Sequence, residues 1–177
     1  MRQWSTARLA GAAVGVLAFA AGVISLRRRR GRGVAMDNKE IARRLLEDPW
    51  RGKLDETLEF VGDDYIGHVP GSPEPLRGKD AFREFATTFL TAFPDGTITV
   101  DDDFAEGDFV ASRWTGTGTN TGEFLGMPAT GRQVTVEGMT FSRIEGGTVR
   151  EDWTLWDTLS FMQQLGAIPE TMPAGTT

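Results

Sequence analysis

The sequence predicts an α+β fold, in which a curved antiparallel sheet packs its concave face on helices that precede it in the chain. Two observations lead to this prediction. Before residue 94 apolar residues recur at helical spacing, whereas after residue 97 the chain has the pattern of strands separated by tight turns. Helices followed by a run of strands are typical of the α+β class. Such an arrangement leaves a pocket between the helices and the sheet.

Three helical segments are predicted before the sheet. The first begins at residues 37–40, which resemble a capping box, and ends at Pro49. A second short helix is predicted over 54–62. The most regular pattern lies in 79–93, where apolar residues recur three or four positions apart before the turn residues 94–96.

The remaining segments are predicted from turn signals and alternation. A short extended piece at 64–69 precedes the Pro- and Gly-rich stretch 71–78, which is predicted as a loop with no room for a helix. Four strands follow, the last three as an antiparallel meander, before a final short helix. Their predicted ranges are 97–104, 109–121, 133–144 and 148–155 for the strands and 158–165 for the helix.

Length and composition limit the classes of function. A chain of 177 residues is long enough for one domain with a sizeable core and too short for two ordinary ones. The chain has no cysteine, which excludes disulfide scaffolds, thiolate metal sites and cysteine nucleophiles. A reducing cytoplasm fits this composition best.

Charge is distributed unevenly along the chain. The net charge is −6, yet seven of the 19 basic residues precede residue 36 and all 25 acidic residues follow it. A domain that is this acidic repels phosphate backbones, so nucleic-acid binding is not expected.

The first 35 residues form a separate hydrophobic, Arg-rich segment. Residues 9–26 are uncharged, and a stretch of about 18 residues is near the lower limit for a membrane-spanning helix. The Arg run at 27–30 would place the following domain in the cytoplasm. A single anchor is one interpretation, and a start-site artefact with a cytoplasmic domain beginning at Met36 is the other. Residues 36–168 form the predicted domain and 169–177 a flexible tail.

Candidate chemistry is concentrated in the last strand. The chain has no Gly-x-Ser-x-Gly, dinucleotide, P-loop or zinc motif, and one histidine, His68, is too few for a multi-His metal site. Strand alternation places Glu151, Trp153 and Asp157 on one face, which we interpret as a pocket wall. A carboxylate there would have a raised pKa and suit acid–base chemistry. Alternatively, Asp157 only caps the final helix.

Other polar residues also have two interpretations. His68 is a candidate donor at the pocket mouth, or a packing residue without a chemical role. Glu151 and Arg143 lie on neighbouring strands and could instead form a structural ion pair. The small residues at 115–119 allow a ligand or a helix to come close, or mark a bend in the sheet.

Ordered sequence blocks along the domain resemble one known family. These blocks are 122–132, 137–143, 147–153, Asp157 and 163–166, together with Tyr65, His68 and 93–95. They are similar to the SnoaL-like polyketide (ester) cyclases of the NTF2-like superfamily over roughly residues 36–168.

This resemblance implies a cone-shaped NTF2-like fold with a deep apolar pocket, frequent homodimers, and no metal or organic cofactor. It also implies an intramolecular aldol-type ring closure of an apolar polyketide-like ester, with an acid/base aspartate near the end of the last strand. Asp157 and His68 fall at the catalytic positions. The pocket residues that we expect are Arg143, Glu151, Trp153, Phe141, Trp114 and Tyr65.

Two other functions remain open. One is isomerisation or epoxide hydrolysis on the same scaffold, with Glu151 as a second carboxylate. The other is a non-catalytic small-molecule-binding module, in which Asp157 is exposed at the start of a helix. A buried Asp157 in an enclosed cavity would favour the catalytic hypothesis.

Overall fold

The computed structural model of the chain describes residues 36–169. The helices are α1 (Asn38–Glu47), the 3-10 turn η1 (Asp48–Arg51), α2 (Leu54–Thr57), α3 (Gly78–Ala92) and α4 (Thr158–Leu165). The strands are β1 (Val61–His68), β2 (Leu76–Arg77), β3 (Thr97–Glu106), β4 (Phe109–Thr119), β5 (Gln133–Glu145) and β6 (Thr148–Trp156).

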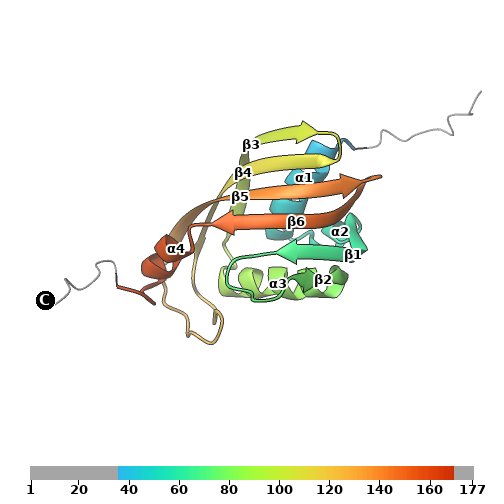
Figure 1. Ribbon diagram of the computed structural model, residues 1–177. Coiled ribbons are helices and arrows are strands. Elements are labelled where there is room, and N and C mark those ends of the chain that lie inside the picture. Colours follow the sequence, from blue (N-terminus) through green and yellow to red (C-terminus); the bar gives the residue numbers. More distant parts are fainter. Residues whose placement is uncertain (1–35, 170–177) are drawn as a thin grey trace, which may run out of the picture. The chain divides into compact units, whose positions relative to one another are not determined.

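The six strands form one curved sheet in the order β2-β1-β6-β5-β4-β3 (Figure 1). Every neighbouring pair is antiparallel except β1 and β6, which run parallel. The predicted strands after residue 97 and the antiparallel meander are confirmed. Two features were not predicted: the pairing of β1 with β6, which joins distant parts of the chain, and the short strand β2 within the segment 71–78.

Local capping determines where α1 begins. Asp37 has an extended backbone, and its side chain accepts a hydrogen bond from the Glu40 amide at 2.8 Å. The predicted helices at 79–93 and 158–165 are confirmed as α3 and α4. The prediction of a helix over 54–62 is wrong at its end, because Val61 pairs with Val149 of β6 and is 1% exposed. Burial in the sheet overrides the helical spacing there.

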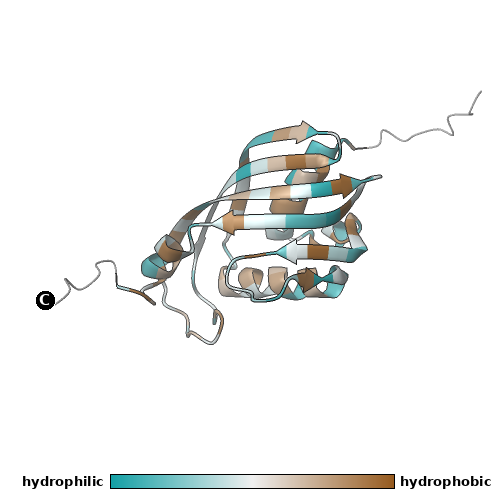
Figure 2. Ribbon diagram, viewed as in Figure 1, coloured by the Kyte–Doolittle hydropathy of each residue, from teal (hydrophilic) through white to brown (hydrophobic). Residues whose placement is uncertain are grey.

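The helices α1 and α3 cover one face of the sheet, and in Figure 1 α1 lies behind the strands. Both hydrophobic and hydrophilic residues occur along the strands, as expected for a sheet with two different faces (Figure 2). The buried side chains form two clusters. One joins α1, β1 and the adjoining ends of β4 to β6, and the other joins the end of α3 to α4 and the segment before β5.

Close approach of α3 to the sheet depends on a glycine in β4. A Cβ atom on Gly118 would lie 3.1 Å from the Cβ atom of Phe93, at the end of α3. The prediction that small residues at 115–119 admit a helix is therefore confirmed at this position.

Within residues 36–169 no helix is long and apolar enough to cross a membrane. The predicted anchor at 9–26 and most of the predicted tail lie outside the described residues.

Candidate functional site

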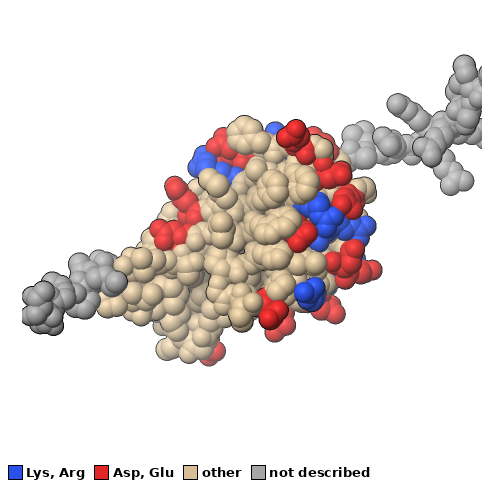
Figure 3. All heavy atoms as spheres, in the orientation of Figure 1, with Lys and Arg blue, Asp and Glu red and all other residues tan. Residues whose placement is uncertain are grey.

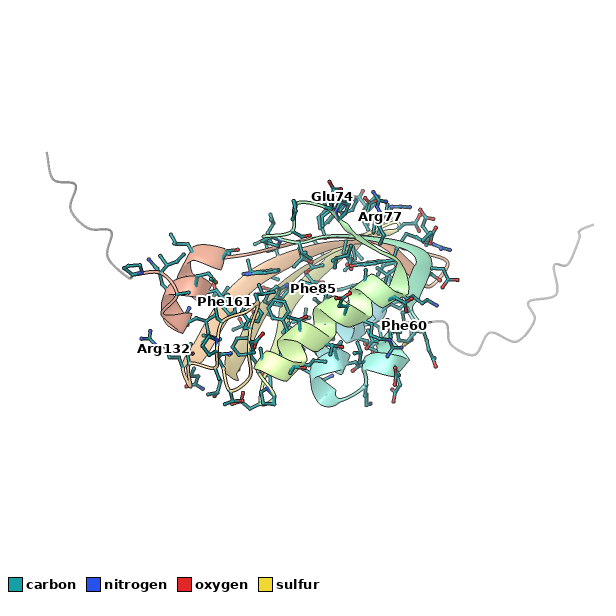
Figure 4. All side chains as sticks on the ribbon, turned by 90° about the horizontal axis from the view of Figure 1, so that it is seen from below. Phe60, Glu74, Arg77, Phe85, Arg132 and Phe161 are labelled. Atoms are coloured by element: carbon teal, nitrogen blue, oxygen red, sulfur yellow. The ribbon has the colours of Figure 1, made fainter. Side chains whose placement is uncertain are left out.

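An apolar cavity lies between α3 and the sheet, where the two buried clusters meet. The volume of this cavity is about 160 Å³, counted as the space that the centres of water molecules can reach. Its wall is mainly apolar and includes many aromatic side chains: α3 contributes Phe82, Phe85 and Phe89, and α4 contributes Phe161. Figure 4 views the molecule from the side of α3 and shows the labelled Phe85 and Phe161 on the two helices that bound the cavity.

One carboxylate faces this cavity, and it belongs to Asp152 of β6. Among the described residues that line the cavity, Asp152 is the only acidic residue, and none is Lys, Arg or His. Its side chain is 3% exposed, and the Tyr65 hydroxyl donates to its Oδ2 atom at 3.3 Å. The Oδ1 atom is buried and accepts no hydrogen bond of good geometry from residues 36–169, although the hydroxyl of Ser142, directly opposite on β5, is close enough to lower the pKa of the carboxyl group. A buried acceptor without a partner is costly, so a ligand that donates a proton is favoured there.

Burial determines the acidity of Asp152. The pKa of Asp152 is raised from 3.8 to about 6, mainly by the loss of hydration on burial. The hydroxyls of Ser142 and Tyr65 lower this pKa in part, and the charge of Glu151 raises it further. The pKa of Tyr65 is raised well above its ordinary value, first by burial and then by the nearby carboxylate. At neutral pH the site therefore holds an ionised Asp152 and a neutral Tyr65 that donates to it.

Two threonines and a tryptophan line the same wall. The Trp114 indole donates to Thr140 Oγ1 at 3.1 Å, and Thr140 Oγ1 lies 3.1 Å from Thr154 Oγ1. Thr140 and Thr154 are directly opposite each other on β5 and β6. The ring of Trp114 packs over Gly138, where an added Cβ atom would clash with the indole.

A β-bulge decides which residues of β6 reach the cavity. Ile144 of β5 pairs with Val149 of β6. The residue before it on β5, Arg143, pairs with Glu151 rather than with Arg150. The extra residue, Arg150, shifts the alternation by one position. Val149 is therefore buried in the core, while Asp152 rather than Glu151 faces inward.

The predicted pocket wall is consequently on the wrong face. Glu151 and Trp153, together with Arg143 and Phe141 on β5, do not line the cavity. The physical reason is the bulge, because strict alternation from the buried Val149 would have placed Glu151 and Trp153 inward. Of the predicted pocket residues, Tyr65 and Trp114 do line the cavity.

Asp157 also lies outside the cavity. It is exposed and caps α4, accepting a hydrogen bond from the Ser160 amide at 2.9 Å. The capping alternative is therefore the one that the structure supports, and the condition set for a catalytic Asp157, burial in a closed cavity, is not met.

His68 belongs to a cluster on the opposite face of the sheet. Its ring stacks on Trp153 at a centroid distance of 5.3 Å, and its Nε2 atom lies 3.0 Å from Glu151 Oε1. Glu151 also pairs with Arg143 at 3.3 Å, which confirms the ion-pair alternative. The hydrogen bond with His68 and the guanidinium of Arg143 hold the pKa of Glu151 below its usual range. The placement of His68 at the pocket mouth is wrong.

This outer face also exposes large apolar side chains. Phe109, Phe141 and Trp153 contact in sequence across β4, β5 and β6, at centroid distances of 5.1 and 5.9 Å. Figure 3, which looks onto this face, shows a broad area with few charged groups and most of the acidic and basic side chains along its border.

Comparison with known proteins agrees with this architecture. Residues 40–165 match the family described as SnoaL-like polyketide cyclase. The aklanonic acid methyl ester cyclase DnrD of Streptomyces peucetius is 33% identical over 141 residues, covering 77% of this chain and 94% of the relative. The corresponding cyclase DauD of Streptomyces sp. (strain C5) is also 33% identical over 141 residues, which covers 77% of this chain and 85% of DauD.

The chain belongs to the SnoaL-like polyketide cyclase family. Solved structures give the same result for the fold. A SnoaL-like protein from Jannaschia sp. CCS1 superposes with a TM-score of 0.69 at 25% identity, covering 78% of this chain and 98% of that one. IdmH from Streptomyces antibioticus superposes with a TM-score of 0.65 at 32% identity, covering 74% and 99%. The predicted NTF2-like α+β fold is thus confirmed.

Sequence reasoning missed three polar residues of this SnoaL-like site: Asp152, Thr140 and Thr154. Aligning the hairpin on its turn without a bulge would pair Thr140 with Trp153, and only the bulge at Arg150 brings Thr154 opposite Thr140. The sequence pattern of β6 gave no signal for this bulge. Within residues 36–169 no cluster of three or more acidic or histidine side chains could hold a metal ion.

Proposed function

We propose that this chain catalyses intramolecular aldol-type ring closure of an apolar, polyketide-like ester, with Asp152 as the acid/base group. The observation that carries the proposal is the position of Asp152: a buried carboxylate in an aromatic cavity that no cation enters. A carboxyl group with a pKa of about 6 is suited to take and return a proton near neutral pH.

The reaction needs only one proton-transfer group. The Asp152 carboxylate removes a proton from the carbon that lies between the ester and a ketone, which leaves an enolate. The enolate carbon then attacks a second ketone of the same molecule, forming the new carbon–carbon bond while the electron pair of that carbonyl moves to its oxygen. Protonated Asp152 returns the proton to this oxygen. The product is an isomer of the substrate, and no cofactor is consumed.

The cavity supports this proposal by its shape and composition. Aromatic walls such as Phe85 and Trp156 suit flat, conjugated rings, which stack on or meet aromatic side chains edge to face. Enclosure of the ligand also favours one folded conformation, in which the two reacting carbons lie close together. Relatives named as aklanonic acid methyl ester cyclases indicate the class of ester.

The other two hypotheses remain weaker. Isomerisation or epoxide hydrolysis was expected to use Glu151 as a second carboxylate, but Glu151 lies on the outer face with His68. A non-catalytic binding module explains the exposed, capping Asp157. It does not explain why an ionisable carboxylate is buried in the cavity wall, where burial of a charge is unfavourable.

The test is ring closure of the methyl ester of aklanonic acid, followed by chromatography and mass spectrometry. Wild-type protein is expected to produce a compound of unchanged mass and altered retention. Asp152→Asn should lower the rate by about 10²–10⁴-fold, the usual contribution of a general acid or base. Asp157→Asn retains a capping oxygen and should react at the wild-type rate. Tight binding without conversion by wild-type protein would instead support the binding module.

A homodimer through the outer face is part of the proposal. Phe109, Phe141 and Trp153 are 38%, 43% and 37% exposed, and isolated domains rarely leave a contiguous aromatic face in water. In a two-fold dimer this face would pack on the same face of the second copy, so the interface would be self-complementary.

A further inference from the structure

A chain of three polar side chains ends in the cavity near Asp152. The chain begins at the indole nitrogen of Trp114, passes through the hydroxyl of Thr140 and ends at the hydroxyl of Thr154. All three residues line the cavity, and Thr140 is 2% exposed.

The chemistry of these groups fixes the direction of the hydrogen bonds. An indole N–H can only donate, so the Thr140 oxygen is an acceptor toward Trp114. Within residues 36–169 the other partner of the Thr140 hydroxyl is Thr154, and a buried hydroxyl proton needs an acceptor. Thr140 therefore donates to Thr154. The proton of Thr154 has no acceptor among the described side chains that would compete for it, and Thr154 lines the cavity.

We propose that Thr154 donates a hydrogen bond to a carbonyl oxygen of the ligand, so that the cavity selects apolar ketones and esters over hydrocarbons of the same shape. The chain from Trp114 strengthens this donor, because successive hydrogen bonds polarise one another. The inference deepens the proposed function and rests on it for its catalytic meaning.

The spacing on β6 suits such a role. Asp152 and Thr154 are two residues apart on one face, which separates their Cα atoms by roughly 6.5 Å. A carbonyl oxygen bound by Thr154 would place the adjacent carbon on the side of Asp152. When the carbon loses its proton to Asp152, negative charge develops on that same oxygen. A hydrogen-bond donor fixed at this point therefore stabilises the transition state more than the bound substrate.

The test measures binding of 1-tetralone and of tetralin, two bicyclic probes that differ by one carbonyl group, through quenching of the cavity tryptophans. Neither probe can undergo ring closure, so the result is independent of catalysis. In Thr154→Val the ratio of tetralone affinity to tetralin affinity should fall about 3- to 10-fold, the usual contribution of one neutral hydrogen bond. Thr154→Ser keeps the hydroxyl and should retain the ratio.

Thr135→Val is the matched control, because Thr135 lies exposed on β5 and outside the cavity. Circular dichroism of each variant establishes that it is folded. The carbonyl stretching frequency of bound tetralone should be lowered in wild-type protein and in Thr154→Ser, and should return toward the value in an apolar solvent in Thr154→Val. An unchanged affinity ratio in Thr154→Val, or a wild-type protein that binds neither probe, would overturn the inference. If wild-type protein does not catalyse ring closure but Thr154→Val still lowers the affinity ratio, the catalytic proposal is rejected and the role of Thr154 in binding stands.

Discussion

Replacing Asp152 with asparagine should stabilise the protein, and more so as the pH rises. Asparagine has nearly the same shape and can still accept the hydrogen bond from Tyr65, but it has no charge to bury. The wild-type carboxylate has its pKa raised to about 6 by burial. Its ionised form is therefore less stable in the folded protein than in the unfolded chain.

The size of the effect follows from the pKa shift. A shift from 3.8 to about 6 corresponds to about 3 kcal/mol between the two protonation states. Between these two pH values the folded state binds more protons than the unfolded state. The contribution of protonated Asp152 is thus fully present below about pH 4, and it is lost as the pH rises through about 6. Integration between pH 5 and pH 8 gives a loss of about 1 kcal/mol.

The assay is urea unfolding of wild-type protein and of Asp152→Asn at pH 5, 6.5 and 8, monitored by tryptophan fluorescence. All other titrating groups are common to both proteins, so the difference in unfolding free energy isolates Asp152. This difference should increase by about 1 kcal/mol in favour of the variant from pH 5 to pH 8. A difference that stays constant with pH would show that Asp152 ionises normally, and the reasoning about burial and catalysis would be refuted together.

Three further perturbations test the packing, the interface and a cap. Gly138→Ala should destabilise the fold by about 1–3 kcal/mol, measured by urea unfolding, because the new methyl group displaces Trp114; an unchanged stability would argue against this ring position. Phe141→Lys on the outer face should make the protein monomeric, as measured by light scattering. Leu125→Lys, a control in an exposed loop, should remain dimeric at the same concentration. Identical masses for the two variants would reject the interface. Asp37→Ala should cost about 1 kcal/mol of stability and Asp37→Asn much less, unless the cap contributes nothing.

Local patterns predicted most of the fold because most of its elements are determined locally. The amphipathic pattern that became α3, the cap at Asp37 and the turns between the long strands all act over a few residues. The end of the helix predicted over 54–62 could not be located from such local patterns. Val61 fits a helical spacing, and only its pairing with Val149, 88 positions away, makes it part of a strand. Such long-range pairing leaves no local signal.

The site was predicted in part for a related reason. Tyr65 and Trp114 were expected from the resemblance to the family, and both line the cavity. On β6 the prediction assumed strict alternation, which fails beyond Val149 because the bulge at Arg150 reverses the faces of the residues that follow. Hydrophobicity also favoured the wrong face, since Trp153 and Leu155 lie outward while Asp152 and Thr154 lie inward.

The bulge gives two adjacent carboxylates opposite chemistry. Glu151 faces His68 and Arg143 on the outer side, and these partners lower its pKa. Asp152 faces an apolar cavity, and burial raises its pKa. Pairs of acids whose environments separate their pKa values are typical of sites that have assigned acid–base roles. If the guanidinium of Arg143 entered the cavity, its charge would return the pKa of Asp152 toward an ordinary value. The sheet prevents this, because it holds Arg143 on the face away from Asp152.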